Sequence, residues 1–226
     1  MRVTFYGHAC FKVELNNKSI VFDPFIRGNE LAKNIDVKEI NPDFLLLSHA
    51  HSDHIADALE IANQSNATTY AIYEICMWMS KQGNSSFHPM NIGGTAQTNN
   101  ICFTMTPALH SSSFEDGSYG GVPCGFIVQN ETKCFYYAGD TALFSDMSLI
   151  SKKRELDFAF LPVGDNFTMG ITDAIEAAKL LNVKKVVGMH FDTFGYIKIN
   201  HQEAVEQFKE NDLELILMEI GQTLEI

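Results

Sequence analysis

Residues 44–54 read FLLLSHAHSDH, and the rest of the 226-residue chain can be interpreted outward from this stretch. Its first four residues are all apolar, which is typical of a short strand buried on both faces. The remainder holds three histidines and one aspartate, and an amphipathic helix is expected from about His54 to Asn63. Imidazole and carboxylate are natural ligands of zinc and neighbouring divalent ions. A helix cap by Ser52 or Asp53 is the alternative, but a cap does not call for three histidines. The stretch therefore predicts a metal site.

Length and composition indicate a globular protein without a basic surface. The chain has 46% hydrophobic and 11% aromatic residues, enough for a substantial core. A formal net charge of -12 argues against a general nucleic-acid or anionic-membrane partner, because both favour clusters of Lys and Arg. The five cysteines form no C-x-x-C pair, so we expect buried free thiols. We find no secretory leader pattern and no apolar run of transmembrane length, so we expect a cytoplasmic protein that does not enter a membrane.

Short apolar segments and helical patterns alternate along the whole chain. Strands are expected at residues 3–6, 11–15, 19–22, 44–47, 68–72, 101–106, 125–129, 133–138, 158–162, 185–188, 215–218 and 223–226. Further helices are expected at residues 73–81, at 172–181 and after Asn200. Residues 83–94 are expected to form a loop. No linker or low-complexity tract divides the chain, so we expect a single domain spanning residues 1–226.

Several single residues have two interpretations each. His8 could be an ordinary loop imidazole, and Asp23 before a proline suits a turn. Asp57 lies on the helical face of His54, where it could orient a ligand, but we expect it to be solvated. A lone His110 is more often a hydrogen-bonded loop residue than a ligand, and Asp140 would make a good helix cap. His110 and Asp140 nevertheless both follow a predicted strand, as the histidines of residues 44–54 do.

The H-x-H-x-D-H pattern of residues 49–54 resembles the signature of the metallo-β-lactamase superfamily. The resemblance covers essentially the whole chain, with five motifs in order, and extends to HSSS at 110–113, DNFTMG at 165–170 and HFDTF at 190–194. The chain looks most similar to a group of small metal-dependent hydrolases, which are similar in turn to the ascorbate-phosphate lactonases. Gly195 departs from the proline expected in such relatives. The resemblance implies an α/β fold, the four-layer αββα sandwich of two mixed sheets with helices outside.

The resemblance also implies a site with two divalent metal ions. The ligands that it assigns are His49, His51 and His110 for the first ion, Asp53, His54 and His190 for the second, and Asp140 as a bridge between them. Asp53, His54 and Asp140 are the residues we assign to catalysis. Asp23 would orient a ligand histidine as a hydrogen-bond acceptor, and His8 would lie at the rim. Zinc is the default metal, while manganese, iron and nickel fit the same donors.

The chemistry that follows from such a site is hydrolysis of an ester, lactone, amide or phosphoester bond. A hydroxide shared by the two ions would be the nucleophile, and the chain contains no G-x-S-x-G elbow. Two divalent ions with two aspartates and a hydroxide carry a formal charge of about +1, which favours a small anionic substrate. The loops at 111–121 and 164–170 would flank the site, with Asn166 and Thr168 touching substrate; the alternative for both is an ordinary loop role.

Two other functions are compatible with this scaffold. One is a metal-binding or sensor module without turnover, against which the complete ligand set argues. The other is a di-iron redox protein, as in the flavodiiron branch, which carries a carboxylate where this chain has His51. A homo-oligomer is compatible with the sequence, which specifies none. A small-molecule substrate remains the expected partner, and a nucleic acid does not.

Overall fold

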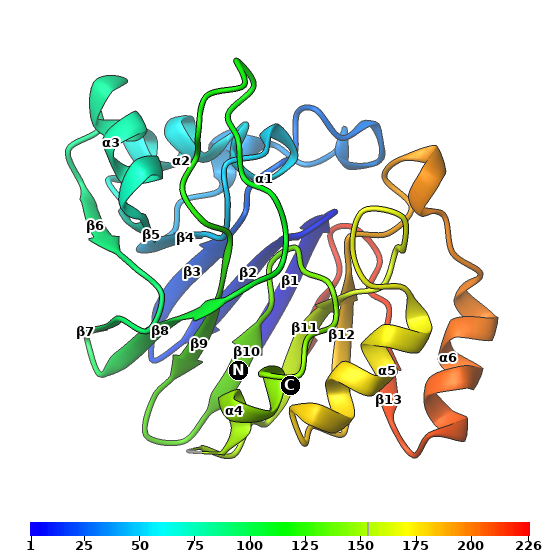
Figure 1. Ribbon diagram of the computed structural model, residues 1–226. Coiled ribbons are helices and arrows are strands. Elements are labelled where there is room, and N and C mark those ends of the chain that lie inside the picture. Colours follow the sequence, from blue (N-terminus) through cyan, green and yellow to red (C-terminus); the bar gives the residue numbers. More distant parts are fainter. Residues whose placement is uncertain (153) are drawn as a thin grey trace. The chain divides into compact units, whose positions relative to one another are not determined.

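The computed structural model describes residues 1–152 and 154–226, which divide into two compact units. Unit 1 comprises Met1–Gly94, Ser111–Pro123 and Glu219–Ile226, and unit 2 comprises Thr95–His110 and Cys124–Met218. Each unit is built on one seven-stranded mixed sheet with helices (Figure 1). The expected organisation as one domain, residues 1–226, stays a prediction. Within the described residues, no helix has both the length and the apolar character needed to cross a membrane.

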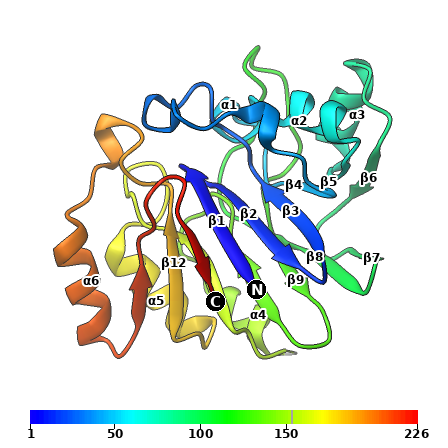
Figure 2. The same ribbon diagram turned by 180° about the vertical axis from the view of Figure 1, so that it is seen from behind.

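The sheet of unit 1 has the strand order β14-β1-β2-β3-β4-β5-β6. Its strands are β1 (Arg2–Gly7), β2 (Cys10–Leu15), β3 (Lys18–Phe22), β4 (Phe44–Leu47), β5 (Thr68–Ile72), β6 (Phe87–Met90) and β14 (Thr223–Glu225). Neighbours are antiparallel from β14 to β3 and parallel from β3 to β6. Asn16 and Asn17 both have positive φ, as a two-residue hairpin turn requires. The two chain ends lie side by side, since Ile226 N donates to Met1 O (Figure 2).

The helices of unit 1 are α1 (Ser52–Ile55), α2 (Ala58–Ser65) and α3 (Tyr73–Lys81), with 3-10 turns η1 (Glu30–Ala32) and η2 (Val37–Glu39). The expected single helix from His54 to Asn63 is wrong, because the chain breaks at Asp57. The buried Asp57 carboxylate accepts from Ile26 N at 2.6 Å and Arg27 N at 3.1 Å. Its expected solvation is therefore wrong as well. These bonds hold the segment after β3 against the start of α2.

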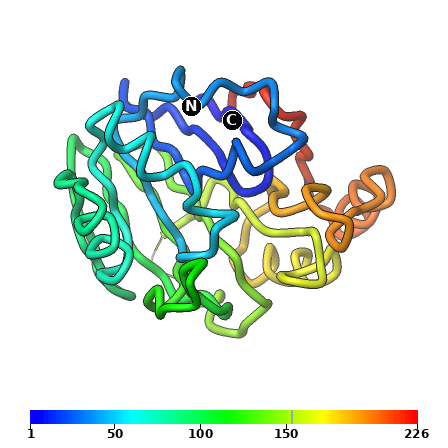
Figure 3. The backbone as a smooth tube through the Cα atoms, turned by 90° about the horizontal axis from the view of Figure 1, so that it is seen from above, coloured from blue at the N-terminus to red at the C-terminus, as the bar shows by residue number. Residues whose placement is uncertain are grey.

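The sheet of unit 2 has the strand order β13-β12-β11-β10-β9-β8-β7. Its strands are β7 (Thr95–Thr98), β8 (Ile101–Pro107), β9 (Cys124–Gln129), β10 (Cys134–Tyr137), β11 (Phe158–Pro162), β12 (Lys185–Met189) and β13 (Glu214–Ile216). The pairs from β7 to β10 are antiparallel and those from β10 to β13 are parallel. The remaining elements are α4 (Met147–Ser151), α5 (Ile171–Leu180), η3 (Gly195–Ile197) and α6 (His201–Glu210). Figure 3 shows α5 and α6 as neighbouring coils.

The parallel strands determine where the polar residues gather in each unit. All residues of β4, β10 and β11 are buried, as their apolar sequences predict. Because parallel strands end at the same edge of a sheet, their carboxyl ends bring the following loops together. In unit 1 these loops begin at Asp23 and Ser48, after β3 and β4. In unit 2 they carry Asp140 and His190, after β10 and β12.

Some elements differ from expectation at the edges of the sheets. Residues 83–94, expected as a loop, contain β6, which pairs in parallel with β5. The proline in its sequence FHPM is tolerated because β6 is an edge strand. The strand β7 and the short helix α4 were also not expected. Trp78 is half-buried on α3. Cys10, Cys76, Cys124 and Cys134 are buried, as expected, whereas Cys102 is only half-buried.

Candidate metal centre

The loop after β4 brings two imidazole nitrogens within contact distance. His49 Nε2 lies 3.0 Å from His51 Nδ1, and the other ring nitrogen of His51 lies 3.3 Å from Ser111 Oγ. Two nitrogens bound to one tetrahedral zinc at ordinary bond lengths are about 3.3 Å apart. The spacing of His49 and His51 therefore fits two ligands of a single ion.

A chain of hydrogen bonds sets which nitrogen of each ring is the acceptor. Ser48 Oγ donates to the Asp23 carboxylate, so it accepts from His49 Nδ1 at 2.9 Å. Asp23 also accepts from His54 Nδ1 at 2.9 Å. With the Nδ1 proton used in this way, both rings present the Nε2 lone pair, which is the form a metal requires. Asp23 thus contacts His54, one of the expected ligands, and its role in orienting a metal ligand stays a prediction.

Asp23 can fill this position because of its backbone. It follows β3 with φ 39°, a left-handed conformation that Asp tolerates better than most residues, and its N–H donates to Leu46 O. Its Oδ1 accepts from Ser48 N at 2.7 Å. The buried carboxylate is therefore surrounded by donors from the loop after β4 and from α1. The sequence analysis did not single out Ser48, although its hydroxyl lies directly beside His49, an expected ligand.

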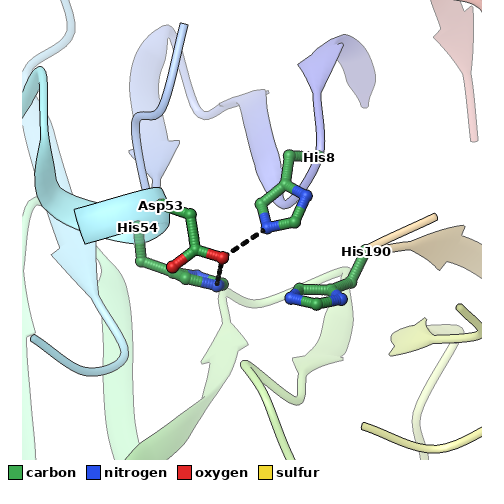
Figure 4. A group of neighbouring side chains, drawn as sticks. All are labelled: His8, Asp53, His54 and His190. Carbon is green, nitrogen blue, oxygen red and sulfur yellow. Dashed lines mark hydrogen bonds and ion pairs between the residues drawn. The ribbon is translucent and has the colours of Figure 1, made fainter. Parts of the chain in front are cut away.

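Asp53 lies between two histidines of unit 1. Its Oδ2 is 3.1 Å from His8 Nε2 and 3.9 Å from His54 Nε2, and Figure 4 shows the carboxylate turned toward both rings. His8 is buried and has φ 56°, so the turn between β1 and β2 directs it inward. A contact with Asp53 goes beyond the role of an ordinary loop imidazole. Asp53 lies inside α1 rather than at its cap, so the capping alternative for Asp53 is wrong.

In unit 2 a single carboxylate oxygen is close to two imidazoles. Asp140 Oδ2 lies 3.0 Å from His190 Nε2 and 3.5 Å from His110 Nε2. Asp140 is buried, and within the described chain the next helix starts only at Met147, so Asp140 is not a helix cap. One oxygen facing two ring nitrogens at these distances suits a carboxylate that binds metal together with them, whether they hold one ion or two. The bridging role inferred from the resemblance stays a prediction.

Local contacts hold His110, Asp140 and His190 of unit 2 in position. Thr141 Oγ1 accepts from Leu109 N at 3.0 Å, and Ala142 N donates to Leu109 O, which positions the residue before His110. His190 has φ 58°. A Cβ on Gly164 would lie 2.0 Å from the His190 carbonyl oxygen, so only glycine allows the two loops to approach this closely. Thr141 is a further residue that the sequence did not single out.

The two residues expected to touch substrate lie in the loop after β11. Asn166 is exposed with φ 55°, and its N–H donates to Asp165 Oδ1 at 2.7 Å. Thr168 is half-buried, and Met169 N in the same loop donates to Thr141 O. The loop is thus tied to the residue after Asp140. Contact of Asn166 or Thr168 with a substrate stays a prediction.

Comparisons with known proteins agree with these observations. Residues 18–191 match the Beta-lactamase superfamily domain. A protein of Flavobacterium johnsoniae named UPF0173 metal-dependent hydrolase is 46% identical over 226 residues, which is 100% of both chains. A protein of the same name from Methylacidiphilum infernorum is 45% identical over 224 residues, 99% of each chain.

The solved structure of Igni18, a metallo hydrolase from the archaeon Ignicoccus hospitalis, has a TM-score of 0.88 and 35% identity. The alignment covers 100% of this chain and 98% of that chain. The expected αββα fold of the metallo-β-lactamase type is confirmed by this likeness and by the family match. The same comparisons confirm that the protein binds divalent metal, without identifying the metal or the number of ions. The chain therefore belongs to the β-lactamase superfamily, within which it is a metal-dependent hydrolase.

Proposed function

We propose that the protein is a dinuclear hydrolase whose two ions share the Asp140 carboxylate. In this proposal the ligands are His49, His51 and His110 for one ion, Asp53, His54 and His190 for the other, and Asp140 for both. The observation that carries it is the position of Asp140 Oδ2, within 3.5 Å of both His110 Nε2 and His190 Nε2. The resemblance assigns these two histidines to different ions, and an oxygen near both is placed to serve each of them.

The loop after β4 supplies the remaining donors of the proposed site in two pairs. His49 and His51 form one pair of neighbouring donors, at 3.0 Å, and Asp53 and His54 form a second, at 3.9 Å. Two divalent ions held there supply an activated water and polarise the bond to be broken. The chain's own contribution is orientation, since Asp23 and Ser48 fix the rings of His54 and His49, and His8 holds Asp53.

The cysteines support water, rather than a side chain, as the nucleophile. Burial raises the pKa of the Cys76 thiol to about 12 and that of Cys134 to about 11. Burial, with the nearby Asp23 and Asp57 carboxylates, raises the pKa of Cys10 well above its ordinary value. These three thiols stay protonated at neutral pH, and a protonated thiol is a poor nucleophile.

The finer properties are part of the same proposal. Zinc is the expected metal, because imidazole and carboxylate donors suit it, and manganese, iron or nickel would fit the same ligands. The expected substrate is a small molecule with an anionic group at the scissile bond. The expected location is the cytoplasm, and a homo-oligomer is compatible with every contact described above.

The test is turnover by the purified, metal-reconstituted protein on a phosphodiester, a set of lactones, a thioester and an amide. Wild type should hydrolyse one class, and Asp140→Ala should lose that activity. Asp146→Ala is the matched control, because Asp146 is an exposed aspartate of the same unit. Two bound ions with no turnover in wild type would favour the metal-binding or sensor module. An iron signal together with redox activity would favour the di-iron protein.

A further inference from the structure

Unit 1 contains a cavity of about 540 Å³ directly beside the loop that carries the proposed ligands. Ala50 and Ser52, which alternate with His49, His51 and Asp53 along the chain, form part of its wall. The other walls are Ile55 of α1, Trp78 of α3 and the segment that begins at Phe114. The volume is within the range of small-molecule sites, which is roughly 300–1,000 Å³.

A hairpin formed by residues 112–120 builds the outer wall. Ser113 pairs with Tyr119, and Phe114 N donates to Ser118 O at 3.0 Å. Its base rests on the ligand loop, because Ala50 N donates to Ser112 Oγ at 3.2 Å. A Cβ on Gly120 would lie 2.2 Å from Ala50 Cβ, so only glycine fits at this position against the Ala50 side chain. The hairpin of residues 112–120 therefore packs directly against the loop that carries His49 and His51.

The inner surface of the cavity is aromatic and flat. The rings of Trp78 and Phe114 are stacked, with centroids 5.3 Å apart and planes at 22°. Both side chains are only half-buried, although each ring would gain from full burial. Stacked aromatic walls favour a planar apolar group, which can cover the exposed ring surface.

The rim of the cavity is negatively charged. Glu115 and Asp116 are exposed at the hairpin tip. Among the described residues that line the cavity, none is Lys, Arg or His. Hydrogen bonds from Ser118 Oγ and Ser118 N lower the pKa of the Asp116 carboxyl. The rim is therefore anionic at neutral pH and repels a second anionic group.

We propose that this cavity receives a planar, apolar part of the substrate that carries no negative charge. The proposal rests on the proposed function, since it takes the neighbouring ligand loop as the place of reaction. The proposal narrows the expected substrate class. Any negative charge of the substrate lies at the bond being hydrolysed. The group that enters the cavity is aromatic or similarly flat, and it is neutral or cationic.

Trp78 is the only tryptophan of the chain, so its fluorescence reports on this cavity directly. The experiment titrates metal-free protein with benzyl alcohol, benzylamine and benzoate, which share one ring and differ in charge. Removing metal prevents benzoate from binding through an ion. Saturable changes in emission are expected for the alcohol and the amine. Benzoate should bind about threefold to tenfold more weakly, as repulsion by two exposed carboxylates would cause.

Three variants keep Trp78 as the reporter. Phe114→Ala should weaken binding of all three compounds, while Tyr119→Ala, an exposed ring on the same hairpin that does not line the cavity, should leave it unchanged. The double variant Glu115→Gln and Asp116→Asn, at the surface, should bring benzoate to the affinity of benzyl alcohol.

Absence of a saturable change with any compound in wild type would overturn the proposal. Equal binding of benzoate and benzylamine would overturn it too, as would an unchanged Phe114→Ala variant. These measurements need neither metal nor turnover, so their failure is distinct from a silent substrate panel. Once a substrate class is known, Phe114→Ala should raise KM for its aromatic members with kcat preserved.

Discussion

Asp23 is fully buried, and three hydrogen bonds described above end on its carboxylate: from Ser48 N, Ser48 Oγ and His54 Nδ1. A buried carboxylate is costly unless donors replace the water that it loses. Here the donors belong to residues at or beside proposed ligands, so the stabilisation of Asp23 and the orientation of the imidazoles have the same cause. The sequence predicted Asp23, but the hydrogen bonds that link it through Ser48 to His49 were recognised only in the folded structure.

Replacing Asp23 with Asn should weaken metal binding about 10-fold to 100-fold, the usual effect of losing an acceptor behind a ligand. The amide keeps the shape of the side chain but presents a donor where either Ser48 Oγ or His54 Nδ1 now donates. Competition with a chromophoric chelator measures the affinity. Asp43→Asn is the control, because Asp43 also accepts a backbone N–H at a strand end but pairs with Lys18. Equal metal affinity in Asp23→Asn and Asp43→Asn would contradict the prediction.

Asp43 itself should make stability depend on pH. Burial raises the pKa of its carboxyl, but hydrogen bonds from Lys18 Nζ at 2.6 Å and Ser19 N at 2.9 Å outweigh this and lower the pKa. The unfolded value is about 3.9, so the stabilisation is present above that pH and is lost as pH falls through the lower folded value. Asp43→Asn should therefore lower the urea midpoint at pH 7, and the difference from wild type should shrink below about pH 4. A difference that does not change with pH would be inconsistent with this origin.

At the scale of elements, periodicity and apolar runs predicted the strands that lie inside each sheet. They failed for β6, whose sequence FHPM contains a proline, and for β7, whose sequence TAQT has a single hydrophobic residue; both strands lie at a sheet edge, where such sequences are tolerated. The break between α1 and α2 was invisible for another reason. It depends on Asp57 accepting from Ile26 and Arg27, residues about thirty positions earlier in the chain. Local pattern cannot show such a bond.

Asp57→Ala should therefore destabilise unit 1 by about 2–4 kcal/mol, since it leaves the buried N–H of Ile26 and the partly buried N–H of Arg27 without their acceptor. Denaturant unfolding measures the loss as a shift in midpoint. Glu60→Ala, one turn along the same region, removes an exposed ion pair with Arg27 and should cost about 0–1 kcal/mol. Similar costs for the two variants would show that the Asp57 bonds do not hold the chain after β3.

At the scale of the whole molecule, the proposed ligands are spread from residue 49 to residue 190, and unit 1 is assembled from three separate segments. The sequence could predict the ligand types, because the motif and the strand ends carry them. It could not predict the hydroxyl contacts of Ser111, Ser112 and Thr141, or the stacking of Trp78 on Phe114. Those contacts arise only when segments distant in the chain are folded together.

Removal of metal should lower the thermal stability of the entire protein, because an ion bound to the folded chain and not to the unfolded chain adds free energy by mass action. Free metal at 100 times Kd adds about 2.7 kcal/mol. For a chain of this length each kcal/mol shifts Tm by about 2–4 °C, so a chelator should lower Tm by roughly 5–11 °C. Differential scanning calorimetry with and without chelator, followed by zinc readdition, measures the shift.

Asp140→Ala should show a smaller shift because it loses the shared carboxylate, while Asp146→Ala should behave as wild type. A wild-type Tm that chelation leaves unchanged, or an Asp140→Ala shift equal to that of wild type, would contradict a metal centre that depends on Asp140.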